Sequence, residues 1–203
     1  MPSTAAASPR RAGTAATSRS TTSGTPTSPS SPHPPRARCS TSSNCLRSGG
    51  STAFASAQAA YESLSEPLRR FVDGPDAVHG IGNEPREVHW EGQTVNAAEV
   101  EHPVVAVHPE TGRKDLFVNP LLTRHIKGLE PVESAALLAL LYDRGARLEN
   151  VIQYRWRRGD LVLWDNRAVR HRRVEDNDPA APRIVHRVQL RDSAPVGPAR
   201  TPA

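Results

Sequence analysis

The chain has 203 residues and a formal net charge of +5, but its composition changes sharply near residue 50. Residues 1 to 50 hold six Arg and no Asp, Glu, Lys or aromatic residue, so the rest of the chain carries a net charge of −1. The basic balance therefore belongs to the first segment, and it gives no support to a basic domain that binds nucleic acid.

Residues 1 to 48 consist mostly of Ser, Thr, Pro, Ala and Arg. Such a segment cannot bury enough apolar surface to offset the entropy of ordering it, so we expect it to be disordered. Nucleic-acid binding through this tail is an alternative. It is disfavoured because the arginines are scattered among prolines and no aromatic side chain is present to stack on bases.

Both cysteines, Cys39 and Cys45, lie in this first segment. The rest of the chain therefore has neither a disulfide scaffold nor a thiolate metal site. No stretch approaches the roughly 20 apolar residues that span a bilayer, and no signal-peptide core is visible. We expect a cytoplasmic protein without a membrane partner.

Two short helices are predicted where the composition changes. Ser56 is a suitable N-cap for an Ala-rich turn, and Ser65 with Pro67 opens a second helix that stops near Gly74. Residues 75 to 101 are polar and rich in turn formers, without a clear period. We expect them to form a long loop.

The middle of the chain predicts two strands and then one longer helix. Residues 102 to 120, "HPVVAVHPETGRKDLFVNP", favour two short strands around a turn at residues 110 to 113. Residues 130 to 146, "EPVESAALLALLYDRGA", carry apolar side chains at helical spacing, with Pro131 in the first turn and Gly145 at the end.

The last third is predicted to be β. Residues 150 to 165 form two runs separated by Gly159 and Asp160, which is typical of a hairpin turn. Residues 183 to 190, "RIVHRVQL", alternate between two faces. The face with Arg183 and Arg187 suits solvent or an anionic ligand, and we expect the opposite, more apolar face to meet the core. That face carries Ile184, His186, Val188 and Leu190.

Three segments together resemble the taurine dioxygenase (TauD/TfdA) family of Fe(II)- and 2-oxoglutarate-dependent dioxygenases. They are "HPVVAVHPETGRKDLFVN", "YRWRRGDLVLWDNRAVRH" and "RIVHR", in the family's order, and the resemblance runs from about Gly49 to Leu190. It implies a mainly β fold with flanking helices. This is the double-stranded β-helix, a jelly-roll barrel, here incomplete at its N-terminal side.

The resemblance also implies roles for individual residues. His171, after "WDNR", matches the family's distal iron ligand, and Arg183 matches the arginine that grips 2-oxoglutarate. Thr52, in "GGST", matches a threonine that contacts the same co-substrate. Arg187 matches the residue that meets the substrate's sulfonate in taurine dioxygenase. Phe117 is a candidate for the substrate side, with a core aromatic as the equal alternative.

The implied reaction is oxidative decarboxylation of 2-oxoglutarate with Fe(II) and O₂, coupled to hydroxylation of a small anionic substrate. The family takes its other two iron ligands from a His-x-Asp motif upstream of "GGDT", and this chain has no His-x-Asp. His108 and Glu110 are rejected as substitutes because they belong to the "HPETG" turn. We therefore expect very weak iron binding and little or no turnover, and a non-catalytic anion-binding remnant is the alternative.

A shift of reading frame would account for the missing motif. Read one base out of frame, "GTPT" at residues 24 to 27 can encode "WHAD" or "WHTD", and "CLRSGG" can encode "LPEVGG". We therefore interpret residues 1 to about 48 as a possible frameshift product. Residues 49 to 192 are the expected dioxygenase domain, and residues 193 to 203 are an expected disordered tail. Oligomeric state, including a homo-oligomer, is left open.

Overall fold

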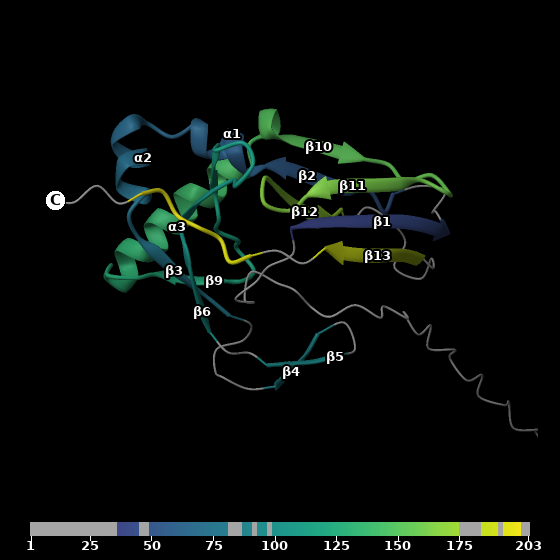
Figure 1. The fold of residues 1–203 in the computed structure, drawn as a ribbon, viewed down its shortest axis with the longest axis horizontal. Helices are drawn as coiled ribbons and strands as arrows, with labels where there is room; N and C mark the ends of the chain where they lie inside the picture. The colour runs from purple at the N-terminus through teal and green to yellow at the C-terminus, as the bar shows by residue number, and fades with distance from the viewer. Residues whose placement is uncertain are drawn as a thin grey trace, which may run out of the picture.

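The structure is a computed structural model that describes residues 36–44, 49–80, 87–90, 93–96, 99–174, 184–190 and 193–199. Strands and short helices dominate it, as expected for a mainly β chain with flanking helices (Figure 1). In chain order the elements are β1 (Ala37–Asn44), β2 (Thr52–Ser56), α1 (Ala57–Glu62), α2 (Glu66–Val72), β3 (Asp76–His79), β4 (Glu87–Trp90), β5 (Gln93–Asn96), β6 (Val100–Pro103), β7 (Val105–Val107), β8 (Lys114–Leu116), β9 (Thr123–Ile126), α3 (Pro131–Gly145), a 3-10 helix (Leu148–Asn150), β10 (Val151–Tyr154), β11 (Leu161–Asp165), β12 (Val169–Arg173) and β13 (Ile184–Leu190).

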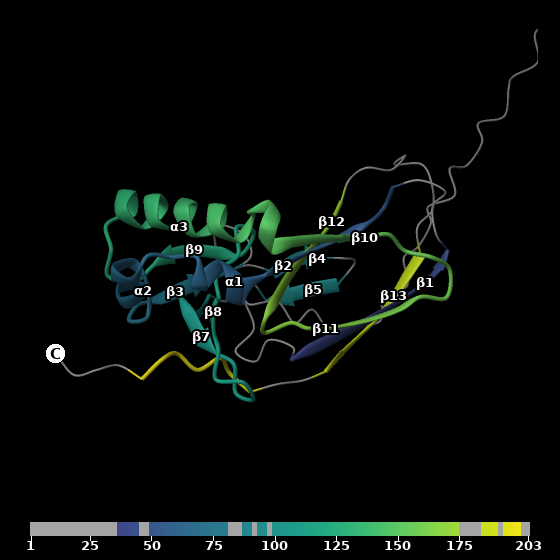
Figure 2. The ribbon, with the colours of Figure 1, turned by 90° about the horizontal axis from the view of Figure 1, so that it is seen from above.

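Two antiparallel three-stranded sheets form one half of the molecule. The first, here sheet A, has the order β11-β1-β13, and the second, sheet B, has the order β10-β2-β12. The two sheets lie as layers over one another (Figure 2). Trp164 of sheet A reaches across to Phe54 of sheet B, with the ring centroids 5.3 Å apart. Aromatic contacts therefore fill part of the space between the layers.

Strand β1 departs from the expectation that residues 1 to 48 are disordered. Residues 37 to 44 form the middle strand of sheet A and pair with both β11 and β13. Backbone N–H and C=O groups carry this pairing, so a strand can form from small polar residues that pack weakly. The prediction of disorder from composition is therefore wrong for residues 37 to 44.

The turn at Gly159 does not close a hairpin. Gly159 adopts a positive φ of 86°, which glycine tolerates without a steric penalty. The strands on either side, β10 and β11, are present as expected, but β10 pairs with β2 and β11 pairs with β1. The expected hairpin is therefore wrong, because the chain crosses from sheet B to sheet A at this turn.

The orientation of β13 is the reverse of the expected one. Val185, Arg187 and Gln189 are half-buried, whereas Val188 and Leu190 are 64% and 52% exposed. Arg187 lies opposite Ser40, which is buried. The arginine face thus points toward sheet B and the aliphatic face points outward.

A second half of the molecule contains the sheet β6-β3-β9, the hairpin β7-β8 and the three α-helices. Its core includes Val72, Ala77, Val104, Ile126 and Leu141, all essentially inaccessible to solvent. Strand β3 lies in the middle of its sheet. The expected loop over residues 75 to 101 is therefore wrong at β3, β4, β5 and the start of β6. At β3 the alternation is hidden because Ala77, Val78 and His79 are all buried.

The helices and the β7-β8 hairpin confirm the sequence predictions. Ser56 caps α1, accepting a hydrogen bond from the Ala59 N–H at 3.1 Å. Ser65 and Pro67 open α2. In α3, Glu130 and Glu133 form a reciprocal capping box that satisfies N–H groups of the first turn. Leu138 and Leu141 are buried, as the helical spacing predicts.

Residues 193 to 199 lie against β7, although the sequence analysis expects residues 193 to 203 to be disordered. The Val107 N–H donates to the carbonyl of Val196 at 2.8 Å, and Gly197 lies beside Pro103. This part of the expected tail is thus ordered by backbone pairing. Among the described residues, no helix is both long enough and apolar enough to cross a membrane.

Candidate functional site

Thr52 and His171 lie on the same face of sheet B. His171 is in the middle of β12, directly opposite Phe54 of β2, and Thr52 is two residues before Phe54. Residues that face each other across an antiparallel pair share a side of the sheet, and so do alternate residues of one strand. Thr52 and His171 are therefore diagonal neighbours, with Cβ atoms about 7 Å apart.

The side chain of His171 points into the space between the two sheets. Its ring lies 4.9 Å from the ring of Trp164 and 6.2 Å from that of Phe54, measured between centroids. Phe54 and Trp164 are both buried. This is a largely apolar environment, in which a polar ligand would be shielded from bulk water.

The hydroxyl of Thr52 is held by an indole. Trp156, in the segment between β10 and β11, donates its Nε1–H to Thr52 Oγ1 at 2.9 Å. Because the indole is a donor only, the Thr52 oxygen must act as the acceptor in this bond. Trp156 was not singled out from the sequence, although it lies within the quoted "YRWRRGD" segment.

Arg187 faces the same inter-sheet space from the opposite layer, on the inner side of β13. Three of the five residues proposed from the sequence, Thr52, His171 and Arg187, therefore lie on the inner faces of the two sheets. Arg183 lies outside the described residues, so its position stays a prediction.

Phe117 lies elsewhere. Its ring packs against the rings of the buried His79 and His102, and the Arg170 guanidinium stands 5.1 Å from its centroid. Arg170 immediately precedes His171 in β12, so it points to the other side of the strand. The structure thus does not bring Phe117 to the face that carries His171, and its packing is that of a core aromatic.

A buried carboxyl group accompanies Phe117. Asp115 is 1% exposed, and neither of its oxygens has a hydrogen-bond donor among the described residues, with Arg170 Nη2 3.6 Å from Oδ1. Burial raises the pKa of Asp115 to about 7, although Arg170 opposes this shift. Asp115 and Phe117 line a cavity of about 430 Å³, together with Arg167 and with residues 193 to 197 and 199.

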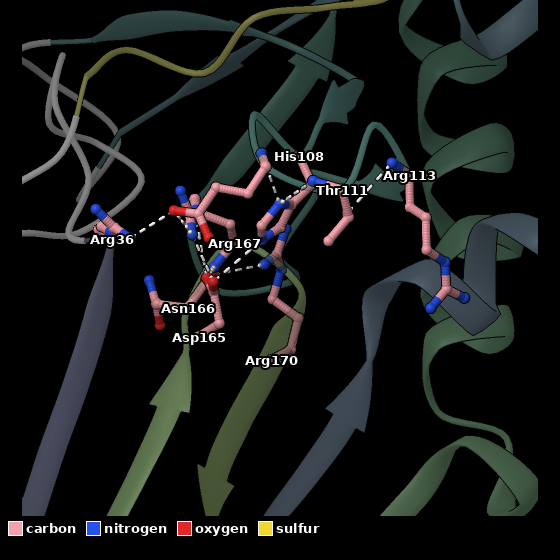
Figure 3. A network of polar contacts seen from close by, with 9 residues as sticks. Arg36, His108, Thr111, Arg113, Asp165, Asn166, Arg167 and Arg170 are labelled. Atoms are coloured by element: carbon pink, nitrogen blue, oxygen red, sulfur yellow. Dashed lines mark hydrogen bonds and ion pairs between the residues drawn. The ribbon is translucent and has the colours of Figure 1, made fainter.

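A polar network joins the β7-β8 turn to the turn between β11 and β12 (Figure 3). His108 Nδ1 accepts from the N–H groups of Glu110 and Thr111, both at 3.3 Å, so its proton is on Nε2. Nε2 then donates to Asp165 Oδ2 at 3.0 Å. Although burial raises the pKa of Asp165, hydrogen bonds from Arg167 and His108 lower it to about 2.

This network explains why His108 is unsuited to metal binding, since both ring nitrogens are engaged. Its residues come from "HPETG" and "WDNR", which the sequence analysis used only as markers. The sequence does contain a histidine in one turn motif and an acid in another, which could have suggested a hydrogen bond between His108 and Asp165. It does not show that the two turns lie close together.

The described residues do not make an iron site. No group of three His, Cys, Asp or Glu side chains among them converges closely enough to hold a metal ion. His171 is the single proposed ligand that the structure describes, whereas the facial arrangement of non-haem Fe(II) oxygenases needs two histidines and a carboxylate.

Comparison with known proteins identifies the family. The model of the family described as "Taurine catabolism dioxygenase TauD, TfdA family" matches residues 10–189. The chain belongs to this family. The match begins before Gly49, where the sequence analysis placed its start, and it includes β1.

Two curated TauD/TfdA relatives show how much of the family the chain covers. It is 41% identical over 161 residues to an alpha-ketoglutarate-dependent sulfate ester dioxygenase of Pseudomonas putida, covering 74% of this chain and 53% of that relative. It is 36% identical over 153 residues to an alpha-ketoglutarate-dependent 2,4-dichlorophenoxyacetate dioxygenase of Cupriavidus pinatubonensis, covering 73% and 53%. The chain spans about half the length of these relatives.

A solved TauD-type structure has a similar fold. The crystal structure of a taurine dioxygenase from Burkholderia xenovorans superposes with a TM-score of 0.73 at 36% sequence identity. The match covers 83% of this chain and 56% of that one. The observed sheets and helices are therefore arranged as in TauD dioxygenases over most of the chain.

Proposed function

We propose that this chain carries the co-substrate-binding part of an Fe(II)- and 2-oxoglutarate-dependent dioxygenase that uses O₂ to hydroxylate a small anionic substrate. The observation that carries the proposal is the placement of Thr52 and His171 on one inner face of sheet B in a TauD/TfdA chain. Sheets A and B are then the surviving part of a double-stranded β-helix.

Each residue has a distinct role in this proposal. His171 binds the metal ion, and Thr52 and Arg183 bind the carboxylates of 2-oxoglutarate. Arg187 pairs with the anionic group of the substrate, which is a sulfonate, sulfate ester or carboxylate, because a guanidinium binds such groups bidentately. Phe54 and Trp164 exclude water from this space. Phe117 does not contact the substrate directly in this proposal, since it packs beside Arg170 on the side of β12 opposite to His171.

We further propose that the chain in its present form turns over little or no substrate. One proposed ligand among the described residues does not satisfy the three-ligand requirement. Residues 1 to about 48 would then be the product of a shifted reading frame, and residues 49 to 192 the dioxygenase domain. Resequencing the DNA between the codons for Ser18 and Thr52 tests this directly. The frameshift idea fails if no frame there encodes His-x-Asp.

A binding experiment separates the dioxygenase from a non-catalytic anion-binding module. The second candidate is favoured by the lack of a three-ligand cluster among the described residues. Calorimetry measures 2-oxoglutarate binding with added Fe(II) under argon and with EDTA. We expect Thr52→Val to weaken binding about tenfold, since it removes a hydroxyl that bonds to a charged ligand. Thr41→Val, on the outer side of sheet A, is the matched control.

The two arms of this experiment have opposite meanings. Binding that weakens with EDTA and in His171→Ala supports a role for the metal ligand. Binding that is unchanged by EDTA and by His171→Ala supports the non-catalytic module. Succinate formation by the present chain with Fe(II) at the rate of a frame-restored chain would refute the proposed inactivity.

A further inference from the structure

The turn between β10 and β11 is held by the carboxylate of Asp160. Its Oδ2 accepts hydrogen bonds from the backbone N–H of Arg157 at 2.7 Å and from the hydroxyl of Tyr154 at 2.8 Å. These bonds from Arg157 and Tyr154 lower the pKa of Asp160, so its carboxylate is charged at neutral pH. The turn is thereby tied together from the last residue of β10 to the residue before β11.

This turn presents the indole of Trp156 to Thr52. The rings of Trp156 and Tyr154 meet edge to face, with their centroids 5.4 Å apart and their planes at 86°, which is a favoured geometry for aromatic pairs. Tyr154 is also the strand partner of Thr52 in the β2-β10 pair. The indole Nε1–H donates to Thr52 Oγ1 at 2.9 Å, although the two residues are 104 positions apart in the chain. Trp156 is therefore fixed by an aromatic contact on one side and by a hydrogen bond on the other.

The indole restricts how the Thr52 hydroxyl can be oriented. A threonine hydroxyl has one proton to donate and two lone pairs that accept, whereas an indole N–H can only donate. Trp156 therefore occupies one lone pair of Oγ1 and disfavours every rotamer in which the hydroxyl proton points at the indole. Thr52 is only 7% exposed, so bulk water competes little with this bond. The hydroxyl proton is thus directed toward an acceptor on another side of the oxygen.

Given the proposed function, in which Thr52 binds a carboxylate of 2-oxoglutarate, we propose that Trp156 is a positioning residue for this co-substrate. By donating to Thr52 Oγ1, it turns the hydroxyl proton toward a carboxylate oxygen. A donor that is oriented beforehand loses less freedom on binding, and hydrogen bonds in a chain strengthen one another. The bond from Thr52 to the carboxylate is also charge-assisted, which makes its orientation matter more. Tyr154 and Asp160 act on the co-substrate only through Trp156.

A double-mutant cycle on 2-oxoglutarate binding tests this role. Calorimetry on the full chain with Fe(II) under argon gives the dissociation constants of wild type, Trp156→Phe, Thr52→Val and the double variant. Trp156→Phe keeps an aromatic ring but removes the N–H, and we expect it to weaken binding about fivefold. In the Thr52→Val background the same substitution should have less than about a twofold effect, because no hydroxyl remains to be oriented. Tyr142→Phe, which removes a hydrogen bond from α3 to Asn119, is the matched control.

NMR spectroscopy follows the indole itself and does not depend on turnover. The Nε1–H resonance of Trp156 is assigned by its loss in Trp156→Phe, and it should shift when 2-oxoglutarate is added. Its exchange with solvent should become at least about tenfold faster in Thr52→Val, which removes the acceptor. Thr52→Ser keeps the hydroxyl, so it should retain both the slow exchange and the effect of Trp156→Phe on binding.

The possible outcomes separate the positioning role from the proposed function. If Thr52→Val weakens 2-oxoglutarate binding but Trp156→Phe does not, the positioning role is wrong and the proposed function stands. Equal losses for Trp156→Phe with and without the Thr52 hydroxyl would also overturn the positioning role, because they indicate that the indole acts through packing. If the wild-type chain binds no 2-oxoglutarate, the proposed function fails and the positioning role fails with it.

Discussion

Replacing Asp115 by Asn should change how the stability of this protein depends on pH. The carboxyl group of Asp115 is 1% exposed, and burial raises its pKa from 3.8 to about 7. Since the folded state keeps a proton that the unfolded state has lost, wild-type stability falls as pH rises from 3.8 to 7. The loss is limited to about 1.4 kcal/mol per pH unit, or at most about 4 kcal/mol in all.

The prediction concerns the difference between Asp115→Asn and the wild type. Between pH 5 and pH 8, the free energy of unfolding of the variant should rise relative to wild type by up to about 3 kcal/mol. In the variant, Arg170 keeps its hydrogen bonds to the carbonyls of Leu116 and Asn166, so its guanidinium still has hydrogen-bond partners.

Urea unfolding followed by tryptophan fluorescence, at several pH values and low protein concentration, measures this difference. Asp143→Asn, on the exposed side of α3, controls for the substitution itself. A difference between Asp115→Asn and wild type that stays constant across this pH range would refute the reasoning. A constant difference would mean that Asp115 is already ionised at pH 5, because Arg170 stabilises its carboxylate.

Two further substitutions test local structure. Ser56→Ala should lower the free energy of unfolding by about 1 kcal/mol, because it removes the hydrogen bond that caps α1, whereas Ser65→Ala should cost less because Ser65 makes no such bond. Equal losses in urea unfolding would contradict this. His108→Ala should cost about 2 kcal/mol, because it removes one of the hydrogen-bond donors to Asp165 and the acceptor of two backbone N–H groups. The exposed His125→Ala is its control in thermal unfolding, and equal melting temperatures would be the contrary result.

The helices were predictable from sequence because their signals are local. Ser56, Pro67 and the capping pair around Pro131 act within one turn, and the structure has all three helices at the expected places. The pairing of strands depends on distant residues. Gly159 marks a turn correctly, but nothing near it shows that β10 and β11 join different sheets.

The face of β13 could not be chosen from its own residues. Its apolar side is the more hydrophobic, yet that side points to solvent, because Trp164 and Ser40 of the neighbouring strands set the inner direction. Thr52 and His171 were found through family motifs, and their common face follows from the register of β2 and β12. The site of Phe117 needed the three-dimensional structure, since its contact with Arg170 spans more than fifty residues.

Strand β1 shows that strand pairing tolerates a sequence from which an iron site could not be built. Its residues are mostly small and polar, and sheet A includes it through backbone pairing with two neighbours, which any non-proline sequence can supply. An iron site has no such tolerance, because it needs particular imidazole and carboxylate groups. A shifted reading frame upstream of Thr52 would therefore leave the sheet in place while removing the ligands. Family membership and the sheet architecture are therefore compatible with an inactive chain. The DNA sequence between the codons for Ser18 and Thr52 decides whether the iron ligands were lost through a shift of reading frame.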